Sequence, residues 1–250
     1  MRNYITEAVI LKKYRIGEIH KGLRIFSREH GLMNVIAHGA YKMKNRFRIV
    51  TEPFIHSRMY IYYNPIKETN KLNDIELIDP FEKIRKSIVK YYTASLWAEF
   101  LMDTKAGGNE FSELFDLLVI ALKILDNIEE EKSVLISLGF LIRMIHHMGF
   151  MARDIHCTVC DKKIDKGEDI FFSTRDASVR CRICKNTTDM KLSGESVSFL
   201  YSSMDLPLGR LIDETHEISS LFPLKRFVYV KLESLTDTVM NSIRSSGGIL

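Results

Sequence analysis

The sequence lacks the long apolar runs of a membrane protein. Among its 250 residues, a Lys, Arg, Glu or His interrupts every apolar segment before it reaches the roughly 18 residues that a membrane-spanning helix needs. No charged-then-apolar leader follows Met1. We therefore expect a reducing, cytoplasmic location and no membrane partner.

Signatures of common enzymes are missing as well. The sequence has no phosphate-binding GxxxxGK loop followed by Ser or Thr, no HExxH pair and no GxSxG elbow. No cluster of Asp, Glu and His indicates the metal site of a nuclease or deaminase. We therefore expect a protein that is not an enzyme.

Cysteine is scarce, and its placement is informative. The four cysteines form two CxxC pairs, Cys157 with Cys160 and Cys181 with Cys184, separated by 20 residues. Two such loops direct four thiolates at one tetrahedral centre, so the spacing predicts one structural zinc ion per chain. Four protein ligands leave no position for a reactive water, so this zinc would hold structure and not perform hydrolysis.

Two other uses of the cysteines stay open. Disulfides would need an oxidising compartment, and a redox CxxC would need only one pair, at the start of a helix. His156 stands beside the first pair, and we expect it to be a neighbour of the site and not a ligand.

The positive charge lies at the N-terminus. Residues 1–80 contain 14 Lys and Arg against 8 Asp and Glu, whereas residues 81–150 contain 8 against 10 and residues 151–250 contain 14 against 14. This distribution fits a polyanion-binding module attached to a neutral scaffold, although a solvated basic surface would give the same counts.

Residues 4–79 have the pattern of short strands. Five runs are rich in β-branched and aromatic side chains and are bounded by turn residues: 5–12, 23–26, 32–37, 54–63 and 72–78. Five strands in about 75 residues suit a small barrel. The OB-fold is the five-stranded barrel that binds nucleic-acid strands.

A basic segment, residues 39–48, separates the third and fourth of these runs. It contains Lys42, Lys44, Arg46 and Arg48 at every second position, with Tyr41 and Phe47 among them. In an extended segment this spacing places all four cations on one side, and Phe47 would stack on an exposed base. The alternative is a solvated loop whose two rings enter the core, and the residues alone do not decide between them. Further candidates for DNA contact on the strands are Lys12, Lys13, Arg24 and Arg28.

After Pro80 the apolar period changes from two to about 3.6. Three amphipathic helices are predicted before residue 150, with Gly107-Gly108 as a helix stop between the first two. Beyond the cysteines, short helices are predicted over 196–204 and 208–218, and a longer one runs from Pro223 through Val239 and Ile243. The predicted class is α+β, with an OB-fold domain (1–80), a helical domain in two parts (81–150 and 191–250) and a four-cysteine zinc loop (151–190) between them.

In this order of parts the chain resembles the bacterial RecO family of recombination mediators over nearly its whole length. The resemblance rests on motifs in the barrel and in the first helical part: Ala8-Val-Ile-Leu11 followed by Gly17-Glu18, Phe26-Ser-Arg-Glu-His-Gly31, Ala37-His-Gly-Ala40, Pro53-Phe54, Leu114-Phe115 with Ala121-Leu122, and Gly149-Phe150 shortly before Cys157.

The resemblance implies a non-enzymatic role in DNA repair and recombination after DNA damage. Proteins of this family bind single- and double-stranded DNA, anneal complementary strands and bind the partner RecR. They help to load the RecA recombinase onto strands coated by single-stranded-DNA-binding protein, whose C-terminal tail they bind. A cytoplasmic, nucleoid-associated protein is expected.

The alternative is a zinc-ribbon transcription regulator, but no amphipathic helix here has the Arg, Asn and Gln of a recognition helix.

Overall fold

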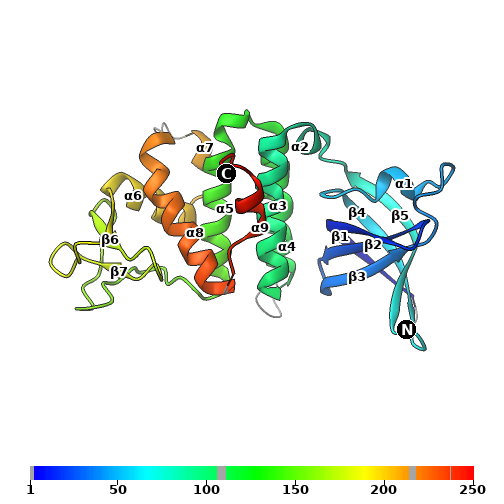
Figure 1. Ribbon diagram of the computed structural model, residues 1–250, viewed down its shortest axis with the longest axis horizontal. Helices are drawn as coiled ribbons and strands as arrows, with labels where there is room; N and C mark the ends of the chain where they lie inside the picture. Colours follow the sequence, from blue (N-terminus) through cyan, green and yellow to red (C-terminus); the bar gives the residue numbers. More distant parts are fainter. Residues whose placement is uncertain (1–2, 106–110, 214–217, 237) are drawn as a thin grey trace. The chain divides into compact units, whose positions relative to one another are not determined.

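A computed structural model describes residues 3–105, 111–213, 218–236 and 238–250. The chain divides into two compact units, Met1–Asn127 and Ile128–Leu250. Among the described residues, the first contains a β-barrel and four helices, the first of which is α1 Phe47–Val50, and the second contains the remaining helices and a small sheet (Figure 1). The predicted α+β class with an N-terminal barrel is confirmed. The division after Asn127 falls within the segment 81–150, which the sequence pattern groups as one helical part.

Five strands form the barrel: β1 Asn3–Ile16, β2 His20–Ser27, β3 Gly31–Ala37, β4 His56–Asn64 and β5 Thr69–Asp79. β1 pairs antiparallel with both β2 and β4, β2 with β3, and β4 with β5. A short parallel pairing of β3 with β5, Val35 opposite Asn70 and Ile36 opposite Lys71, closes the barrel. The closed order β1-β2-β3-β5-β4 is that of an OB-fold-like barrel.

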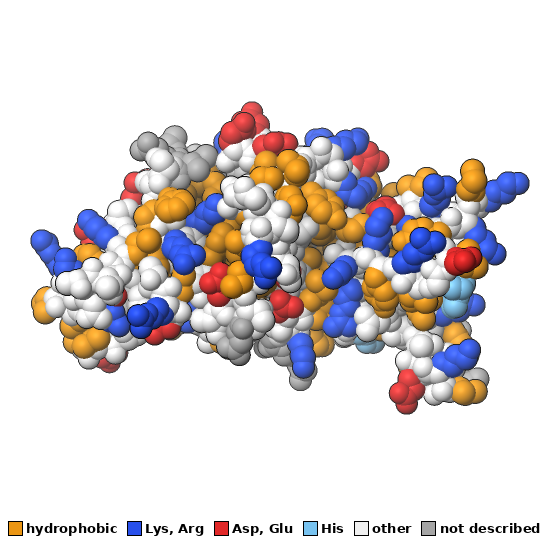
Figure 2. All heavy atoms as spheres, in the orientation of Figure 1, with side chains coloured by type: hydrophobic (Ala, Val, Ile, Leu, Met, Phe, Trp, Pro, Cys, Tyr) orange, Lys and Arg blue, Asp and Glu red, His pale blue; other side chains and the backbone are white. Residues whose placement is uncertain are grey.

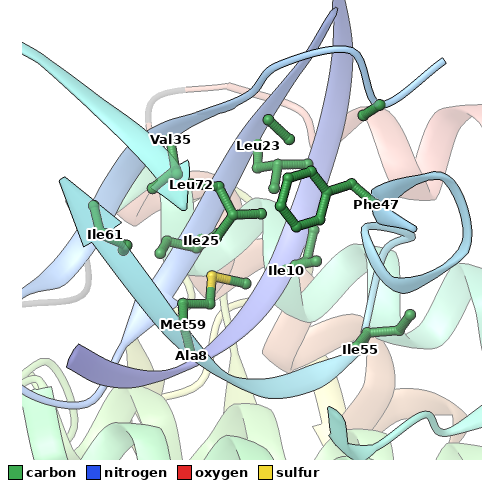
Figure 3. Close-up of a cluster of buried hydrophobic side chains, with 12 residues drawn as sticks. Ala8, Ile10, Leu23, Ile25, Val35, Phe47, Ile55, Met59, Ile61 and Leu72 are labelled. Carbon is green, nitrogen blue, oxygen red and sulfur yellow. The ribbon is translucent and has the colours of Figure 1, made fainter. Parts of the chain in front are cut away.

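The barrel core is made by alternate residues of the strands, because successive side chains of a strand point to opposite faces. Figure 3 shows this cluster, which includes Ala8 and Ile10 of β1, Leu23 and Ile25 of β2, and Met59 of β4, each fully buried. A two-residue repeat over β1 and β2 therefore fixes which face of each strand is inside.

Three further helices belong to the first unit: α2 Glu82–Lys86, α3 Ile88–Asp103 and α4 Phe111–Asn127. α3 begins after Ser87, whose hydroxyl accepts a hydrogen bond from the backbone N–H of Lys90 (3.2 Å). The predicted helix stop at Gly107-Gly108 lies outside the described residues.

α4 packs on the barrel through aromatic side chains. The Phe26 ring of β2 lies 6.5 Å from Phe111 and 6.2 Å from Phe115. Gly31 has φ 64°, and a Cβ there would lie 2.6 Å from the Phe111 ring. A larger residue than glycine at position 31 would therefore be strained and would also separate α4 from β3.

The second unit is built around the apolar helix α5. Its elements are the 3-10 turn η2 Glu130–Lys132, α5 Ser133–His147, β6 Ile170–Phe172, β7 Val179–Arg180, β8 Met190–Leu192, α6 Gly194–Asp205, α7 Arg210–Asp213, the 3-10 turn η3 Ile218–Leu221, α8 Phe222–Thr236 and α9 Asn241–Ser245. Arg143 of α5 donates to the carbonyl of Ser203 (2.7 Å), near the C-terminal end of α6. The strands form a three-stranded sheet in the order β7-β6-β8, and Phe172 of β6 packs against Phe227 of α8.

Two predicted helices differ from the structure. The long C-terminal helix was expected to reach Ile243, but α8 ends at Thr236, and Ile243 lies in the separate helix α9. Of the helix predicted over 208–218, α7 accounts for Arg210–Asp213, and residues 214–217 lie outside the described part. No helix among the described residues is long and apolar enough to span a bilayer.

Candidate nucleic-acid interface and metal centre

The basic segment is folded into turns and is not extended. After β3, turns lead to the short helix α1, Phe47–Val50. Gly39 stands in these turns with φ 68°, a conformation that glycine adopts without strain. The prediction that an every-second-residue spacing places all four cations on one side is therefore wrong, because that period applies only to extended chain.

Phe47 belongs to the barrel core. Only 8% of it is exposed, and its ring points into the cluster near Leu72 and Ile10 (Figure 3). Val50, one helical turn later, packs against the same cluster, and Thr51 donates its hydroxyl hydrogen bond to the Phe47 carbonyl. The interpretation of Phe47 as a base-stacking ring is wrong in this structure, and the alternative in which the ring enters the core is correct for this residue.

The buried ammonium group of Lys21 contacts the basic segment. Lys21 of β2 is 1% exposed, and its Nζ donates to the Arg48 carbonyl (2.8 Å) and to Glu52 Oε1 (2.8 Å). The same Nζ lies 5.3 Å from the centroid of the Tyr41 ring. Burial raises the pKa of Glu52, but hydrogen bonds from Lys13 and Lys21 outweigh burial and hold the pKa of that carboxyl below its usual value. Both ends of the basic segment are thus attached to one buried cation.

The four cations of the segment differ in their partners. Arg46 pairs with Asp74 of β5 at 2.6 Å. The side chains of Lys42, Lys44 and Arg48 are exposed, and within the described part of the chain none of them has an acidic partner at ion-pair distance. These three cations can therefore bind phosphates without first breaking an ion pair with a carboxylate.

Most of the predicted strand cations already have polar partners. Lys13 pairs with Glu52, and Arg24 donates to Asn34 Oδ1 at 3.1 Å. Lys12 is exposed and close enough to Asp103 of α3 to lower the pKa of that carboxyl, which burial raises overall.

Arg28 is a contact between the barrel and α4. Its Nη2 donates to both carboxylate oxygens of Asp116 (2.6 Å each), Nη1 lies 3.6 Å from Glu7, and the guanidinium stands 5.8 Å from the Phe115 ring centroid. Beside it, His56 is buried, and its Nε2 lies 3.7 Å from Glu7 Oε2 and has no hydrogen-bond partner among the described residues; burial lowers its pKa. The arrangement indicates that Arg28 stabilises the packing of α4 on the barrel.

A second group of basic residues was missed by the sequence analysis. His20 and His38 meet edge to face at 4.7 Å, and the Gly39 N–H donates to His20 Nδ1 (2.9 Å). Burial lowers the pKa of His38, and His20, Lys71 and Lys67 lower it further. The nucleic-acid face of an OB-fold consists of strands 2 and 3 with the β1–β2 and β4–β5 loops. His20 begins β2 and Lys67 lies in the β4–β5 loop, while His38 directly follows β3 and Lys71 lies on β5. The signal that could have found them was the fold, since no local motif connects them.

The four cysteines come together at one point of the second unit. Their Sγ atoms all lie within 4.8 Å of one another, and Cys160 Sγ is 3.8 Å from Cys181 Sγ. Sulfurs about 2.3 Å from one tetrahedral zinc would be ~3.8 Å apart. The four thiols therefore fit a single metal ion of this kind, and no other predicted ligand is needed.

Each CxxC pair lies on a tight turn that backbone hydrogen bonds define. The Asp161 N–H donates to the Cys157 carbonyl (2.9 Å), and the Cys184 N–H donates to the Cys181 carbonyl (3.1 Å). Thr158 connects the two loops, because its N–H donates to the Val179 carbonyl at 2.8 Å. His156 contacts Asp161 and stands outside the four-sulfur cluster.

The two loops affect the thiols unequally, and the thiolate is the form that binds metal. Burial raises the pKa of Cys157, but hydrogen bonds from the backbone of Cys181, Cys160 and Val159 outweigh burial and lower it to about 6. The neighbouring thiols Cys160 and Cys181 raise the pKa of Cys184 to about 12. The neighbouring sulfurs thus oppose the ionisation of Cys184 until a cation compensates their charge.

An apolar groove of about 520 Å³ adjoins the metal centre within the second unit. Its apolar lining includes Phe150, Ile155, Val179 and Phe227, and Lys231 of α8 lies among its charged residues.

Comparison with known proteins agrees with this architecture. A family model described as Recombination protein O N terminal matches residues 1–81, and one described as Recombination protein O C terminal matches residues 85–218. The DNA repair protein RecO of a Thermoanaerobacter species is 28% identical over 187 residues, which are 74% of this chain and 73% of that protein. The DNA repair protein RecO of Oceanobacillus iheyensis is 28% identical over 210 residues (82% and 78%), and that of Pelotomaculum thermopropionicum is 25% identical over 213 residues (84% and 80%). Since the two family models together match most of the chain, this protein belongs to the RecO family of DNA repair and recombination proteins.

Proposed function

We propose that this protein is a non-enzymatic recombination mediator that binds single-stranded DNA on its barrel, anneals complementary strands and helps to load RecA onto coated strands. One observation carries the DNA-binding part. Lys42, Lys44 and Arg48 are exposed without acidic partners in the described structure, on a turn that the barrel core holds in place. Phosphates are the groups that such cations bind, and they carry no base identity, so binding would be independent of sequence.

The group formed by His20, His38, Lys67 and Lys71 extends this surface. Lys67 and Lys71 are exposed on the β4–β5 turn and on β5, near His38. A strand that crosses the barrel face at this point would meet cations from two loops, which is the usual arrangement in OB-fold domains. Double-stranded DNA offers the same phosphates and is expected to bind as well.

The partners follow from the family and belong to the same proposal. RecR and the C-terminal tail of single-stranded-DNA-binding protein would bind directly, and RecA would be reached indirectly. The tail is acidic with an apolar end, so it needs an apolar groove with a cation at its edge. The groove beside Phe150 and Phe227 offers the apolar surface and one cation, Lys231, but its two carboxylates, Asp154 and Asp176, make it a poor match for an acidic tail.

The metal in this proposal is one structural zinc per chain, held by the four cysteines. Four thiolates on two turns suit zinc and leave no open coordination position. Its role would be to fix residues 157–184 and the sheet β6–β8, because a site of this kind folds only as it binds the metal.

Titration of single-stranded oligonucleotides at several salt concentrations tests the DNA-binding part. If Lys42, Lys44 and Arg48 each neutralise one phosphate, their replacement by Ala should flatten the plot of log K against log salt by about 2, from roughly 0.7 per contact. The control is Lys123→Ala, which removes an exposed cation of α4. An unchanged slope in the triple variant would show that DNA binds at a site other than this turn. Strand annealing with and without the coat protein then tests the mediator role.

A further inference from the structure

Two highly exposed apolar side chains, one in the basic segment and one directly after it, have no structural role in the core. Met43 is 87% exposed and Ile49 is 77% exposed. Figure 2 shows hydrophobic side chains beside Lys and Arg side chains over the α1 end of the barrel. Large apolar groups at this exposure have an unfavourable free energy of hydration and make no packing contacts. Their burial against a partner would therefore stabilise them.

The geometry of α1 explains why Ile49 faces outward. Successive helical residues are rotated by about 100°, so residues two apart lie on opposite sides of the helix. Phe47 and Val50 face the core, and this orientation turns Ile49 away from it. The core residues therefore fix where the exposed ones lie.

The aromatic rings of the segment are already engaged. Phe47 is buried, and Tyr41 has the Lys21 ammonium 5.3 Å and the Arg15 guanidinium 5.5 Å from its ring centroid. A base that reaches this turn would thus meet the aliphatic side chains of Met43 and Ile49 before an uncovered ring.

Charge identifies the kind of partner. Lys42 and Lys44 flank Met43 in the sequence, and Arg48 precedes Ile49. Each of the two apolar residues is therefore a sequence neighbour of cations that have no acidic partner among the described residues. Phosphates and apolar faces at this short spacing are what an unpaired nucleotide offers, since its base is apolar on both faces and its phosphate is anionic.

We propose that Met43 and Ile49 contact the unpaired bases of single-stranded DNA while Lys42, Lys44 and Arg48 hold its phosphates. The proposal rests on the proposed function, which it deepens by naming the residues that touch bases. The turn is preorganised for this contact, because Lys21, Glu52 and the buried Phe47 hold its ends before any strand binds.

The test compares two oligonucleotides with the same number of phosphates, a thymidine strand and an abasic strand, on the full chain. Wild type should prefer the thymidine strand by on the order of tenfold, as expected from the area that two apolar side chains can bury against bases. Met43→Ser with Ile49→Ser should remove this preference, leave abasic-strand binding unchanged and leave the salt slope unchanged. Lys42→Ala with Lys44→Ala should instead flatten the salt slope for both strands and keep the preference.

A matched control is Ile120→Ser, which removes a half-exposed apolar side chain from α4 and should change neither quantity. Retention of the preference in the double serine variant, together with a flattened slope in the double lysine variant, overturns this inference alone. No change of slope in the lysine variant overturns the proposed DNA surface and the inference with it. Binding to vesicles of phosphatidylserine that requires Met43 and Ile49, with no preference between the two strands, also overturns it and identifies a membrane surface as the partner.

Discussion

Phe47 shows how one residue can change the interpretation of a segment. It lies between Arg46 and Arg48, which suggests a stacking ring, yet its side chain fills the barrel core beside Leu72 and Ile10. The two flanking cations are both exposed, and the Arg46 guanidinium lies 5.2 Å from the centroid of the buried ring and pairs with Asp74.

Phe47→Ala should destabilise the first unit by about 3–5 kcal/mol, because a large ring is removed from a packed cluster. Chemical unfolding followed by circular dichroism measures this. Met43→Ala is the control, since that side chain is 87% exposed and its loss should cost less than about 0.5 kcal/mol. Equal stability of the two variants would place Phe47 outside the core.

The same residue marks a limit of prediction from sequence. The period-two pattern of the strands predicts the barrel correctly, because alternation is set by the chain itself and by a core on one side of each strand. In the basic segment no such constraint acts over more than a few residues. Whether Phe47 faces solvent or core depends on the strands that surround it, and those contacts are made by residues distant in the sequence, such as Leu72.

At the scale of elements, residues 39–52 depend on contacts that their own sequence does not contain. Lys21 of β2 binds the Arg48 carbonyl and the Glu52 carboxylate, so β2 positions the basic turn and α1. The four-cysteine spacing could be interpreted without such knowledge, because each CxxC turn is local and only their meeting needs the fold. In the His20–His38 group, the register of the β2–β3 hairpin brings the two histidines together, but Lys71 joins them only when β3 and β5 pair.

Glu52→Gln should destabilise the barrel by about 1–3 kcal/mol, because it leaves the buried Lys21 ammonium without a charged partner. The folded-state pKa of Glu52 lies below its ordinary value of 4.5, so this stabilisation is present above that value and is lost as the pH falls through the lowered pKa. Urea unfolding at pH 7 and at successively lower pH measures the difference between wild type and variant. Glu18→Gln, at an exposed turn position, is the control. A difference that grows on acidification would contradict the ion pair.

At the scale of the molecule, the candidate sites are divided between two compact units. The candidate DNA surface lies wholly in Met1–Asn127, and the four cysteines and the apolar groove lie wholly in Ile128–Leu250. Metal loss should therefore act on the second unit without unfolding the barrel.

Cys157→Ser should yield protein with far less than one zinc per chain, and amides around β6 to β8 should lose protection against hydrogen exchange. Barrel amides should keep theirs. Elemental analysis and hydrogen-exchange mass spectrometry on the full chain measure both. Val159→Ser is the matched control, because Val159 stands in the same turn with its side chain 63% exposed and provides no ligand. Stoichiometric zinc in the Cys157 variant, or equal loss of protection in the barrel, would contradict this division.

The pairing of β1 has a consequence for synthesis of the protein. β1 is bordered by β2, which follows at once, and by β4, with Asn3 opposite Tyr62. At ~5–20 residues per second, the ribosome makes β4 about 3–12 s after β1. Throughout that interval the edge of β1 that later pairs with β4, from Asn3 to Val9, has no partner strand from its own barrel and is open to a neighbouring nascent chain on the same messenger RNA. The danger of aggregation during production is therefore set by the speed of translation through β2 and β3, and a more stable finished barrel would not reduce it.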